Sequence, residues 1–492
     1  MILPRLTAAC LLVAPLPALA GASPIVDTGQ SRCYDDFRAI PCPAPGQDWY
    51  GQDAQHRRHP ARYRDNGDGT ISDLVTGLMW QKEAQRASWR QAPALAEAAR
   101  TGGHDDWRVP SIKQLYSLIN FDGASGTARP DSRDTPADAR PYLDTRFFSF
   151  ATPEQGRHID VQYLSATAYT GLTMRGDRAF FGVNFADGRI KAYPQDGGPG
   201  RRLWFLRLVR GNPAYGDNAF HDNGDGTVSD RATGLMWSRA DSGGFAADLG
   251  RTAKRDGRLD WKEALRFCNG LTLAGHRDWR LPSAKELQSL VDYRRSPQAT
   301  GSAALDPIFA VSAITDEAGH RNWPYFWSAT THLDGPEPGR FAVYVAFGEA
   351  QGYPGRRAFG PQGRRDGMEG PPDGRMDGPP QGGMMGEPPP DGMMAGPPPG
   401  GGGPPDDTAM LMSMDGPPPG GARPPPGNGR DDETGGATGA LLDVHGAGAQ
   451  RSSPKSGDEA ALPRGRGPQG DVLRIYNYAR CVRDLPDRVR PD

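Results

Sequence analysis

A sixteen-residue stretch occurs twice in this chain and constrains its architecture more than any other feature. The first copy, Asp65–Trp80, reads DNGDGTISDLVTGLMW, and the second, Asp222–Trp237, reads DNGDGTVSDRATGLMW, with thirteen of the sixteen positions identical. Asn-Gly and Asp-Gly pairs favour the positive φ values of a tight turn, so each copy predicts a β-hairpin that ends in a large apolar anchor. A repeat of this kind indicates two copies of one folding unit.

A second block repeats downstream of each hairpin. Trp89–Leu118 aligns without gaps to Trp261–Leu290 at a constant offset of 172 residues. Its GGHDDWRVPS and AGHRDWRLPS segments end in Ser111 and Ser283, each of which predicts an N-cap before a short helix. Further along, YLSAT at residues 163–167 aligns to FWSAT at residues 326–330, and RLVR at residues 207–210 aligns to RCVR at residues 480–483. We therefore expect two tandem domains of ordinary size, at residues 61–211 and 212–484.

The N-terminus has the pattern of an export signal. Residues 1–20 combine a positive Arg5, a short apolar run and an Ala-Leu-Ala cleavage site. A lipoprotein cleavage before Cys10 is the alternative, although the apolar run continues past it. No other run reaches the ~18 apolar residues of a membrane span. The sequence thus predicts a secreted protein, in the periplasm or at the cell surface, with no transmembrane segment.

Four cysteines remain after the signal, and an even number in an exported chain indicates disulfides. Cys33 and Cys42 lie in the segment 21–60, where their spacing suits a small hairpin closed by a bond; a redox pair would favour C-x-x-C. Cys268 lies on the first predicted helix of the second copy and Cys481 on its last predicted strand, residues 475–483. The first copy has alanine and leucine at the aligned positions, so the two cysteines are absent together and we predict that they bond to each other.

The second copy contains a long insertion of biased composition, at about residues 354–470. It is rich in Gly, Pro, Asp and Met, and nine of the thirteen methionines lie between Met368 and Met414. With few aromatic or β-branched residues it cannot pack a core, so we expect a disordered arm. The net charge of −2 gives no reason to expect nucleic-acid binding.

The ordered motifs DNGDGT, TGLMW, DWR[LV]PS, SAT and R-C-V-R together resemble the Lcl C-terminal domain family, named for the C-terminal domain of the Legionella collagen-like adhesin. The resemblance implies an α+β fold similar to the C-type-lectin and formylglycine-generating-enzyme group, with a mainly antiparallel twisted sheet and two helices in each domain. It also implies cell-surface adhesion and binding of sulfated polysaccharide. The chain departs from that picture because it is not net basic and its insertion lacks a collagen period.

Two sets of residues are candidate sites. The first set could stack sugars or bind anions, since indole faces and guanidinium groups suit both. Its members are Trp107, Arg108, Trp279 and Arg280. The alternative is that the tryptophans are core residues and that each arginine pairs with an internal carboxylate such as Asp106 or Asp278.

The second set could bind calcium through the aspartates of the repeated hairpin. Its members are Asp65, Asp68, Asp222 and Asp225. The D-x-x-D-G spacing differs from that of an EF-hand loop, and the alternative is that these carboxylates accept bonds from backbone N–H groups of the turn.

The sequence contains no nucleophile elbow, phosphate loop or zinc motif, so we expect a binding protein rather than an enzyme. The prediction is an exported cell-envelope adhesion protein that recognises carbohydrate or an extracellular polymer, with no cofactor unless calcium. The alternatives are an oxidoreductase of the formylglycine-generating type and an assembly protein that binds another protein. The oligomeric state is not indicated.

Overall fold

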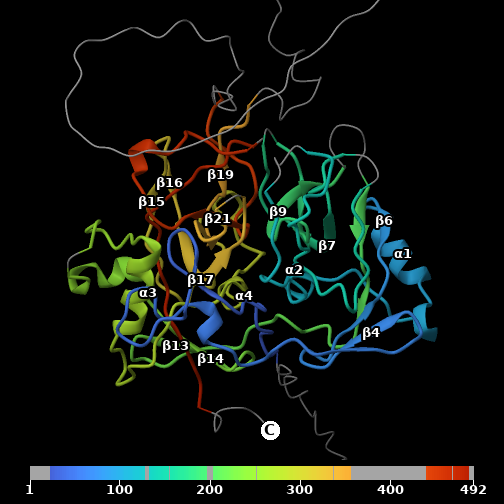
Figure 1. Ribbon diagram of the computed structural model, residues 1–492, viewed down its shortest axis with the longest axis horizontal. Helices are drawn as coiled ribbons and strands as arrows, with labels where there is room; N and C mark the ends of the chain where they lie inside the picture. The colour runs from blue at the N-terminus through green and yellow to red at the C-terminus, as the bar shows by residue number, and fades with distance from the viewer. Residues whose placement is uncertain are drawn as a thin grey trace, which may run out of the picture. The chain divides into compact units, whose positions relative to one another are not determined.

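The computed structural model describes residues 23–127, 132–153, 156–174, 176–196, 203–250, 252–335, 337–355, 439–467 and 469–486 (Figure 1). The signal predicted at residues 1–20 lies outside these ranges, as does most of the predicted insertion. The described parts of both repeats belong to one compact unit. We call residues 61–211 repeat one, residues 212–484 repeat two, and residues 21–60 the leader.

The repeated sixteen-residue stretch forms the predicted hairpin in both repeats. Each hairpin lies in a four-stranded sheet with the strand that precedes it and the last strand of its repeat. In repeat one the strands are β3 (Tyr63–Asp65), β4 (Thr70–Asp73), β5 (Met79–Gln81) and β11 (Val209–Arg210). In repeat two they are β12 (Phe220–Asp222), β13 (Thr227–Asp230), β14 (Leu235–Ser238) and β22 (Val482–Asp484). The last strand of repeat two is therefore much shorter than the predicted strand 475–483.

One eight-stranded sheet runs through both repeats, in the order β17-β18-β21-β9-β8-β7-β10-β6. Repeat two contributes β17 (Tyr325–His332), β18 (Phe341–Ala346) and β21 (Gln450–Pro454). Repeat one contributes β6 (Gln85–Ala87), β7 (Gln162–Ala168), β8 (Ala179–Asn184), β9 (Arg189–Pro194) and β10 (Trp204–Leu206). Antiparallel pairing of Gln450 with Ile190 joins the two halves.

The strand order makes this sheet pseudo-symmetric about the β9–β21 junction. Outward from the junction, the order β9-β8-β7 in repeat one corresponds to the order β21-β18-β17 in repeat two. The first arginines of RLVR and RCVR confirm the equivalence, because Arg207 and Arg480 are both buried and both donate to backbone carbonyls. Arg207 bonds to the oxygens of Gln81 and Ser149, and Arg480 to those of Ser238 and Ala310. The repeats are thus halves of one structure.

Five short α-helices accompany the sheet in the described residues. They are α1 (Ala92–Ala98) and α2 (Ile112–Tyr116) of repeat one, and α3 (Trp261–Gly270), α4 (Ala284–Ser289) and α5 (Pro297–Thr300) of repeat two. Of these, α2, α3 and α4 contact the strands β7, β8, β17 and β18 of the sheet. The predicted N-caps are confirmed, since the hydroxyls of Ser111 and Ser283 accept from the backbone N–H three residues on. The described chain is therefore α+β with a mainly antiparallel sheet, as predicted.

Two equivalent lysines form hydrogen bonds between α2 of repeat one and α4 of repeat two. Lys113 donates to the carbonyl of Ser289 at 2.7 Å, and Lys285 donates to the carbonyl of Ser117 at 2.8 Å. Burial lowers the pKa of Lys113 to about 8 and that of Lys285 to about 7. Each lysine therefore bonds to a carbonyl at the end of a helix of the other repeat, so the hydrogen bonds of each lysine depend on both repeats.

The predicted disordered insertion was wrong for residues 439–467 and 469–470. The short pair β19 (Gln351–Gly352) and β20 (Leu442–Asp443) leads into β21, which pairs along β18. Gln450, Arg451, Ser452 and Ser453 make this strand polar although it is buried. Its residues lack the hydrophobic pattern of a core strand, but its backbone completes the sheet. Residues 356–438 lie outside the described residues.

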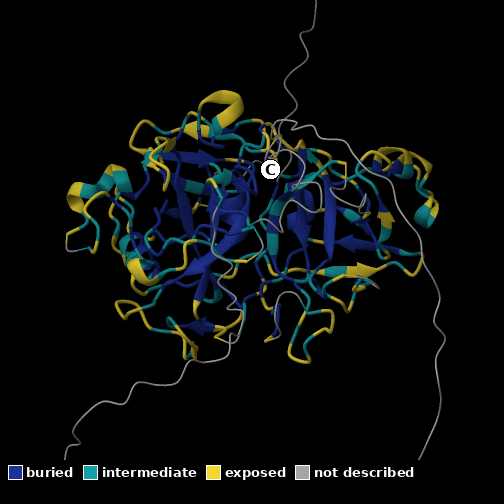
Figure 2. Ribbon diagram, turned by 90° about the horizontal axis from the view of Figure 1, so that it is seen from above, coloured by how far each residue is buried: buried dark blue, intermediate teal, exposed yellow. Residues whose placement is uncertain are grey.

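Both predicted disulfides are confirmed. Cys33–Cys42 closes the hairpin of β1 (Cys33–Tyr34) and β2 (Ala39–Ile40). Cys268 on α3 bonds to Cys481, the residue before β22, across 213 positions of sequence. Burial is concentrated in the strands of the large sheet and exposure in the surrounding loops and helices (Figure 2). Within the described ranges, none of the helices has the length and hydrophobicity of a membrane span.

Candidate functional site

The hairpin aspartates act in the turns of both repeats. Asp65 accepts from the N–H of Gly67, and Asp68 accepts from the N–H and hydroxyl of Thr70. Asp222 and Asp225 make the same bonds in repeat two. In the described part of the chain no three His, Cys, Asp or Glu side chains are grouped to hold a metal ion. These carboxylates therefore accept hydrogen bonds from backbone N–H groups of the turns, which is the alternative to a calcium site.

The paired tryptophans lie in the core. Trp107 is 4% exposed and Trp279 is 2% exposed, and each indole N–H donates to a backbone carbonyl six residues earlier. Neither ring has an open face on which a sugar could stack. The structure thus places these residues where the core alternative put them.

The suggested partners of the paired arginines were wrong. Asp106 and Asp278 bond to Arg210 and Arg483, the last arginines of RLVR and RCVR. Arg108 instead donates to the backbone carbonyl of Asn212.

Arg280 forms a buried two-bond ion pair with Glu286, at 2.6 and 2.7 Å, and also reaches Asp484 at 3.3 Å. Burial would raise the pKa of Glu286, but the charge and hydrogen bonds of Arg280 hold it at about 2. Repeat one has Gln114 and Gly211 at the equivalent positions. The acidic partners are thus specific to repeat two.

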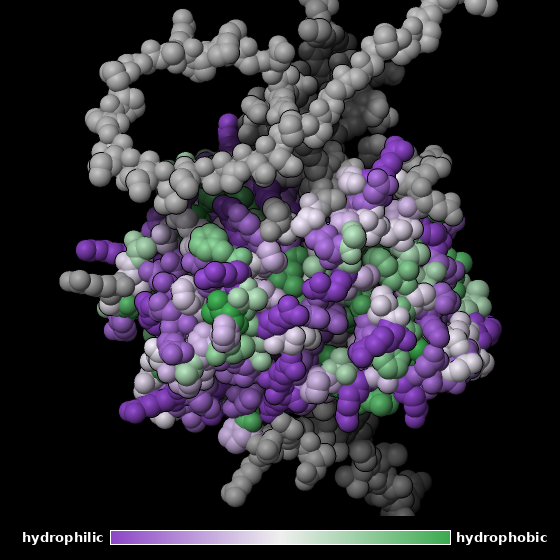
Figure 3. Space-filling model, viewed as in Figure 1, coloured by the Kyte–Doolittle hydropathy of each residue, from purple (hydrophilic) through white to green (hydrophobic). Residues whose placement is uncertain are grey.

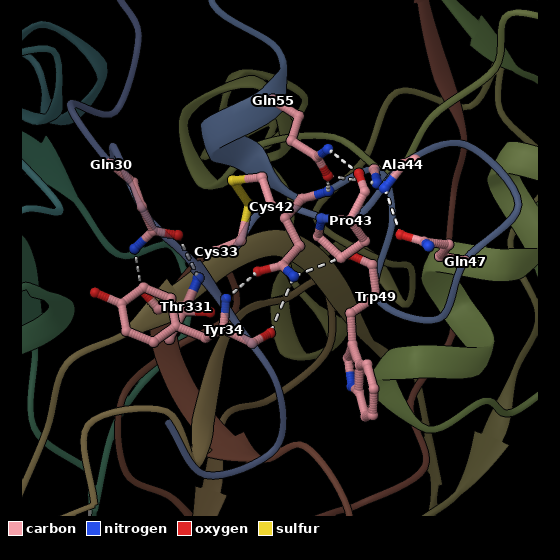
Figure 4. Close-up of a disulfide and its surroundings, with 12 residues drawn as sticks. Gln30, Cys33, Tyr34, Cys42, Pro43, Ala44, Gln47, Trp49, Gln55 and Thr331 are labelled. Atoms are coloured by element: carbon pink, nitrogen blue, oxygen red, sulfur yellow. Dashed lines mark hydrogen bonds between the residues drawn. A yellow bond between two sulfur atoms is a disulfide. The ribbon is translucent and has the colours of Figure 1, made fainter. Parts of the chain in front are cut away.

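The leader packs on repeat two, and nothing local in the sequence signals this. The side-chain amide of Gln30 donates to the carbonyl of Thr331 and accepts from its N–H, at 2.8 and 2.9 Å, which fixes the leader beside β17 (Figure 4). The Cys33–Cys42 bond lies in the same region (Figure 4). Further along, Arg266 of α3 pairs with Asp48 at 2.6 Å. Repeat one has Ala94 in place of Arg266, so it lacks this contact for a leader.

Asp53 is the centre of the leader contact. It begins the 3₁₀ turn η1 (Asp53–Gln55), is 5% exposed, and accepts hydrogen bonds from the hydroxyls of Thr28 and Thr330. Burial raises its pKa to about 6. Thr330 ends the FWSAT motif, and its hydroxyl also accepts from the N–H of Ala284 at the start of α4. The repeated SAT motif was visible in the sequence, but its bond to the leader was not.

Two clefts flank the helices α2 and α4. The first, which we call the leader cleft, has a volume of about 210 Å³ and is lined by residues 25–27, 53 and 55–59 with Arg280, Glu286 and Asp484. Its charges are largely paired, since Arg58 also contacts Asp484 at 2.6 Å. It is smaller than the range of about 300–1,000 Å³ common for ligand sites.

The second cleft, which we call the linker cleft, has a volume of about 570 Å³. It lies between repeat one, residues 212–219 at the start of repeat two, which we call the linker, and the remainder of repeat two. Ser111, Lys113 and Thr167 line one side, residues 215–218 of the linker another, and Phe220, residues 290–294 and Asp306 the third. This cleft is of ligand size and combines aromatic, hydroxyl and carboxylate groups.

The profile of the Lcl C-terminal domain matches the chain twice, at residues 69–210 and 226–360, which is more than half of its length. No curated protein and no solved structure gave a match. The two matched segments cover most of repeat one and the part of repeat two that extends into the start of the predicted insertion. The chain therefore belongs to the Lcl C-terminal domain family.

Proposed function

We propose that this chain is an exported cell-envelope protein of the adhesin type, secreted to the periplasm or cell surface. Its two Lcl C-terminal domains would recognise carbohydrate or another extracellular polymer without bond chemistry. A C-type-lectin-like or formylglycine-generating-enzyme-like fold in each repeat is part of the proposal. Family membership across both repeats supports it, as does the mainly antiparallel sheet with short helices.

The observation that carries the proposal is the pairing of the cysteines. All four cysteines of the described residues lie in disulfides, and disulfides persist in oxidising compartments. An oxidase of the formylglycine-generating type would require a reactive thiol, and both bonds instead hold structural segments together. We accordingly propose a binding protein without a cofactor.

The surface favours a polar ligand. The face in Figure 3 is mainly hydrophilic, with small hydrophobic patches between polar side chains. Large apolar patches mark many protein–protein interfaces, whereas polar clefts with a few aromatic rings suit saccharides. The linker cleft has this character.

Binding of purified glycans by the oxidised protein tests the proposal. The protein would be expressed in the periplasm, its disulfides mapped by mass spectrometry, and its binding measured on a glycan array and to extracted extracellular polysaccharide. We expect saturable binding to at least one polysaccharide. Binding only to proteins would favour the assembly role, and a free Cys268 or Cys481 would favour the enzyme.

A further inference from the structure

The pseudo-symmetry of the repeats creates two equivalent passages between them. One passage has Lys285 and Thr330 of repeat two on one side and Phe121 of repeat one on the other. The sequence alignment and strand order give their counterparts as Lys113, Thr167 and Tyr293, which line the linker cleft. The same framework is therefore present twice, with different contents.

The leader fills the first passage. The carbonyl of Thr28 accepts from the N–H of Phe121 at 2.7 Å, while Lys285 donates to the carbonyl of Asp27 at 3.1 Å. The carboxylate of Asp53 accepts a hydrogen bond from the hydroxyl of Thr330. The leader thus covers this part of β17, a strand in which every residue is buried.

The linker fills only part of the second passage. Lys113 donates to the carbonyl of Gly216 and to Asn218, as Lys285 does to Asp27. The strand β7, however, has no counterpart of Asp53 and Gln30 across it among the described residues, and Thr167 is only partly buried whereas its counterpart Thr330 is fully buried. The unfilled remainder is the linker cleft.

We propose that the linker cleft is the ligand site of this protein and that its ligand is a saccharide without acidic groups. This inference rests on the proposed function and deepens it, since it names the site and the chemical class. Repeat two would then be the copy whose passage is permanently closed by the leader.

The lining of the cleft supplies the groups that such a saccharide needs. The rings of Phe220 and Tyr293, both partly exposed, offer apolar surface for the C–H faces of a sugar. Thr167 and Ser111 present hydroxyl groups, and carboxylates accept bonds from sugar hydroxyls with charge-assisted strength.

The charge of the cleft disfavours sulfated or carboxylated sugars. Asp217, Asp292 and Asp306 line it against two cations. Arg294 is paired with Asp292 at 2.9 Å. Lys113 is directed into three protein acceptors, so it offers little to an incoming anion. Acidic side chains around a site repel an anionic ligand and admit a neutral or cationic one.

A matched pair of variants tests the site. Leu143-Asp144-Thr145 of repeat one aligns to Leu305-Asp306-Pro307 of repeat two. Asp306 accepts from the N–H of Ile308 and Asp144 from the N–H of Arg146, so Asp306→Ala and Asp144→Ala each remove this turn bond. Asp144→Ala also removes the ion pair of Asp144 with the side chain of Arg146, so it is the more disruptive of the two changes to the turn. Only Asp306 lines the linker cleft. Asp217→Ala, at an exposed linker residue, is a second cleft variant. Binding would be measured by calorimetry with maltohexaose, cellohexaose, chitohexaose, chitosan hexamer and a heparin hexasaccharide.

We expect a neutral or amino-sugar hexamer to bind, the affinity to fall at least about tenfold in Asp306→Ala, and Asp144→Ala to bind like the parent. Thermal unfolding of both variants controls for folding. Unchanged binding in both cleft variants would overturn the site and leave the proposed function standing. Binding of heparin alone would overturn the saccharide class. Binding of an oxidised peptide of residues 27–55 in place of all five sugars would identify a leader-like peptide as ligand and overturn the proposal. No binding of any of these probes or of extracted polysaccharide would overturn both proposals.

Discussion

The two repeats share one scaffold and differ in what closes it. In repeat one Ala96 of α1 and Leu208 pack in a buried cluster with Trp107. In repeat two the equivalent positions are Cys268 and Cys481, which are covalently joined in a cluster with Trp279. Only the second repeat has more than a hundred residues between its penultimate and last matched motifs, SAT and R-C-V-R, and a bond that closes so long a loop offsets a large loss of chain entropy.

The second difference lies at the passages between the repeats. Repeat two surrounds Arg280 with carboxylates and receives the leader over Thr330, whereas repeat one leaves Thr167 at an open cleft. Of the two equivalent positions, one is filled by the leader and the other remains an open cleft.

The largest expected effect is the loss of stability on removal of a disulfide, and this loss should differ between the two bonds. Replacing Cys268 and Cys481 together by alanine should lower the free energy of unfolding by about 5 kcal/mol, because the bond closes a loop of more than 200 residues. Replacing Cys33 and Cys42 should lower it by about 3 kcal/mol, because that loop is short. Guanidinium unfolding of both double variants measures the difference. A larger loss for the Cys33–Cys42 pair would contradict the view that repeat two depends on its bond.

A smaller effect is expected from the paired arginines. Arg280→Ala leaves the buried Glu286 without its partner and should cost about 4 kcal/mol of stability. Arg108→Ala removes a bond to a backbone carbonyl and should cost about 1 kcal/mol. Urea unfolding of the two single variants at pH 7 checks this. Equal losses would mean that the acidic partners of Arg280 do not distinguish the repeats.

The smallest effect concerns the pH dependence of the leader contact. Burial raises the pKa of Asp53 to about 6, so the protonated acid is favoured in the folded state. Its contribution to stability is complete below its unfolded pKa and is lost as the pH rises through about 6.

Relative to Asp53→Asn, which cannot ionise, the parent should therefore lose about 1 kcal/mol between about pH 5 and about pH 7. Other groups titrate in this range, and the comparison with the variant cancels them. A parent and variant that change in parallel would show that Asp53 is not buried in solution.

The sequence predicted what depends on neighbouring residues or on the comparison of the repeats. The hairpin turns, the caps at Ser111 and Ser283, and both disulfides were predicted because each leaves a local pattern or a paired absence. The strand β21 was missed because its polar residues are buried by the sheet around them and not by their own hydrophobicity.

The candidate site was less predictable. Trp107 and Trp279 attracted a binding hypothesis because of their chemistry, yet they belong to the core. The contact of Asp53 with Thr330 joins residues 277 positions apart, and the leader has no second copy with which to compare it. The open passage appears only when both repeats are placed around the common sheet.

Carbodiimide footprinting of carboxylates, read by mass spectrometry on the oxidised protein, tests the central claim most directly. The claim is that the leader fills one passage and leaves its counterpart open. It predicts that Asp217 and Asp306 are modified under native conditions while Asp53, at 5% exposure, is modified only after unfolding. Modification of Asp53 as readily as Asp217 would show that the leader does not close the passage in repeat two, and the contrast between the repeats would be lost.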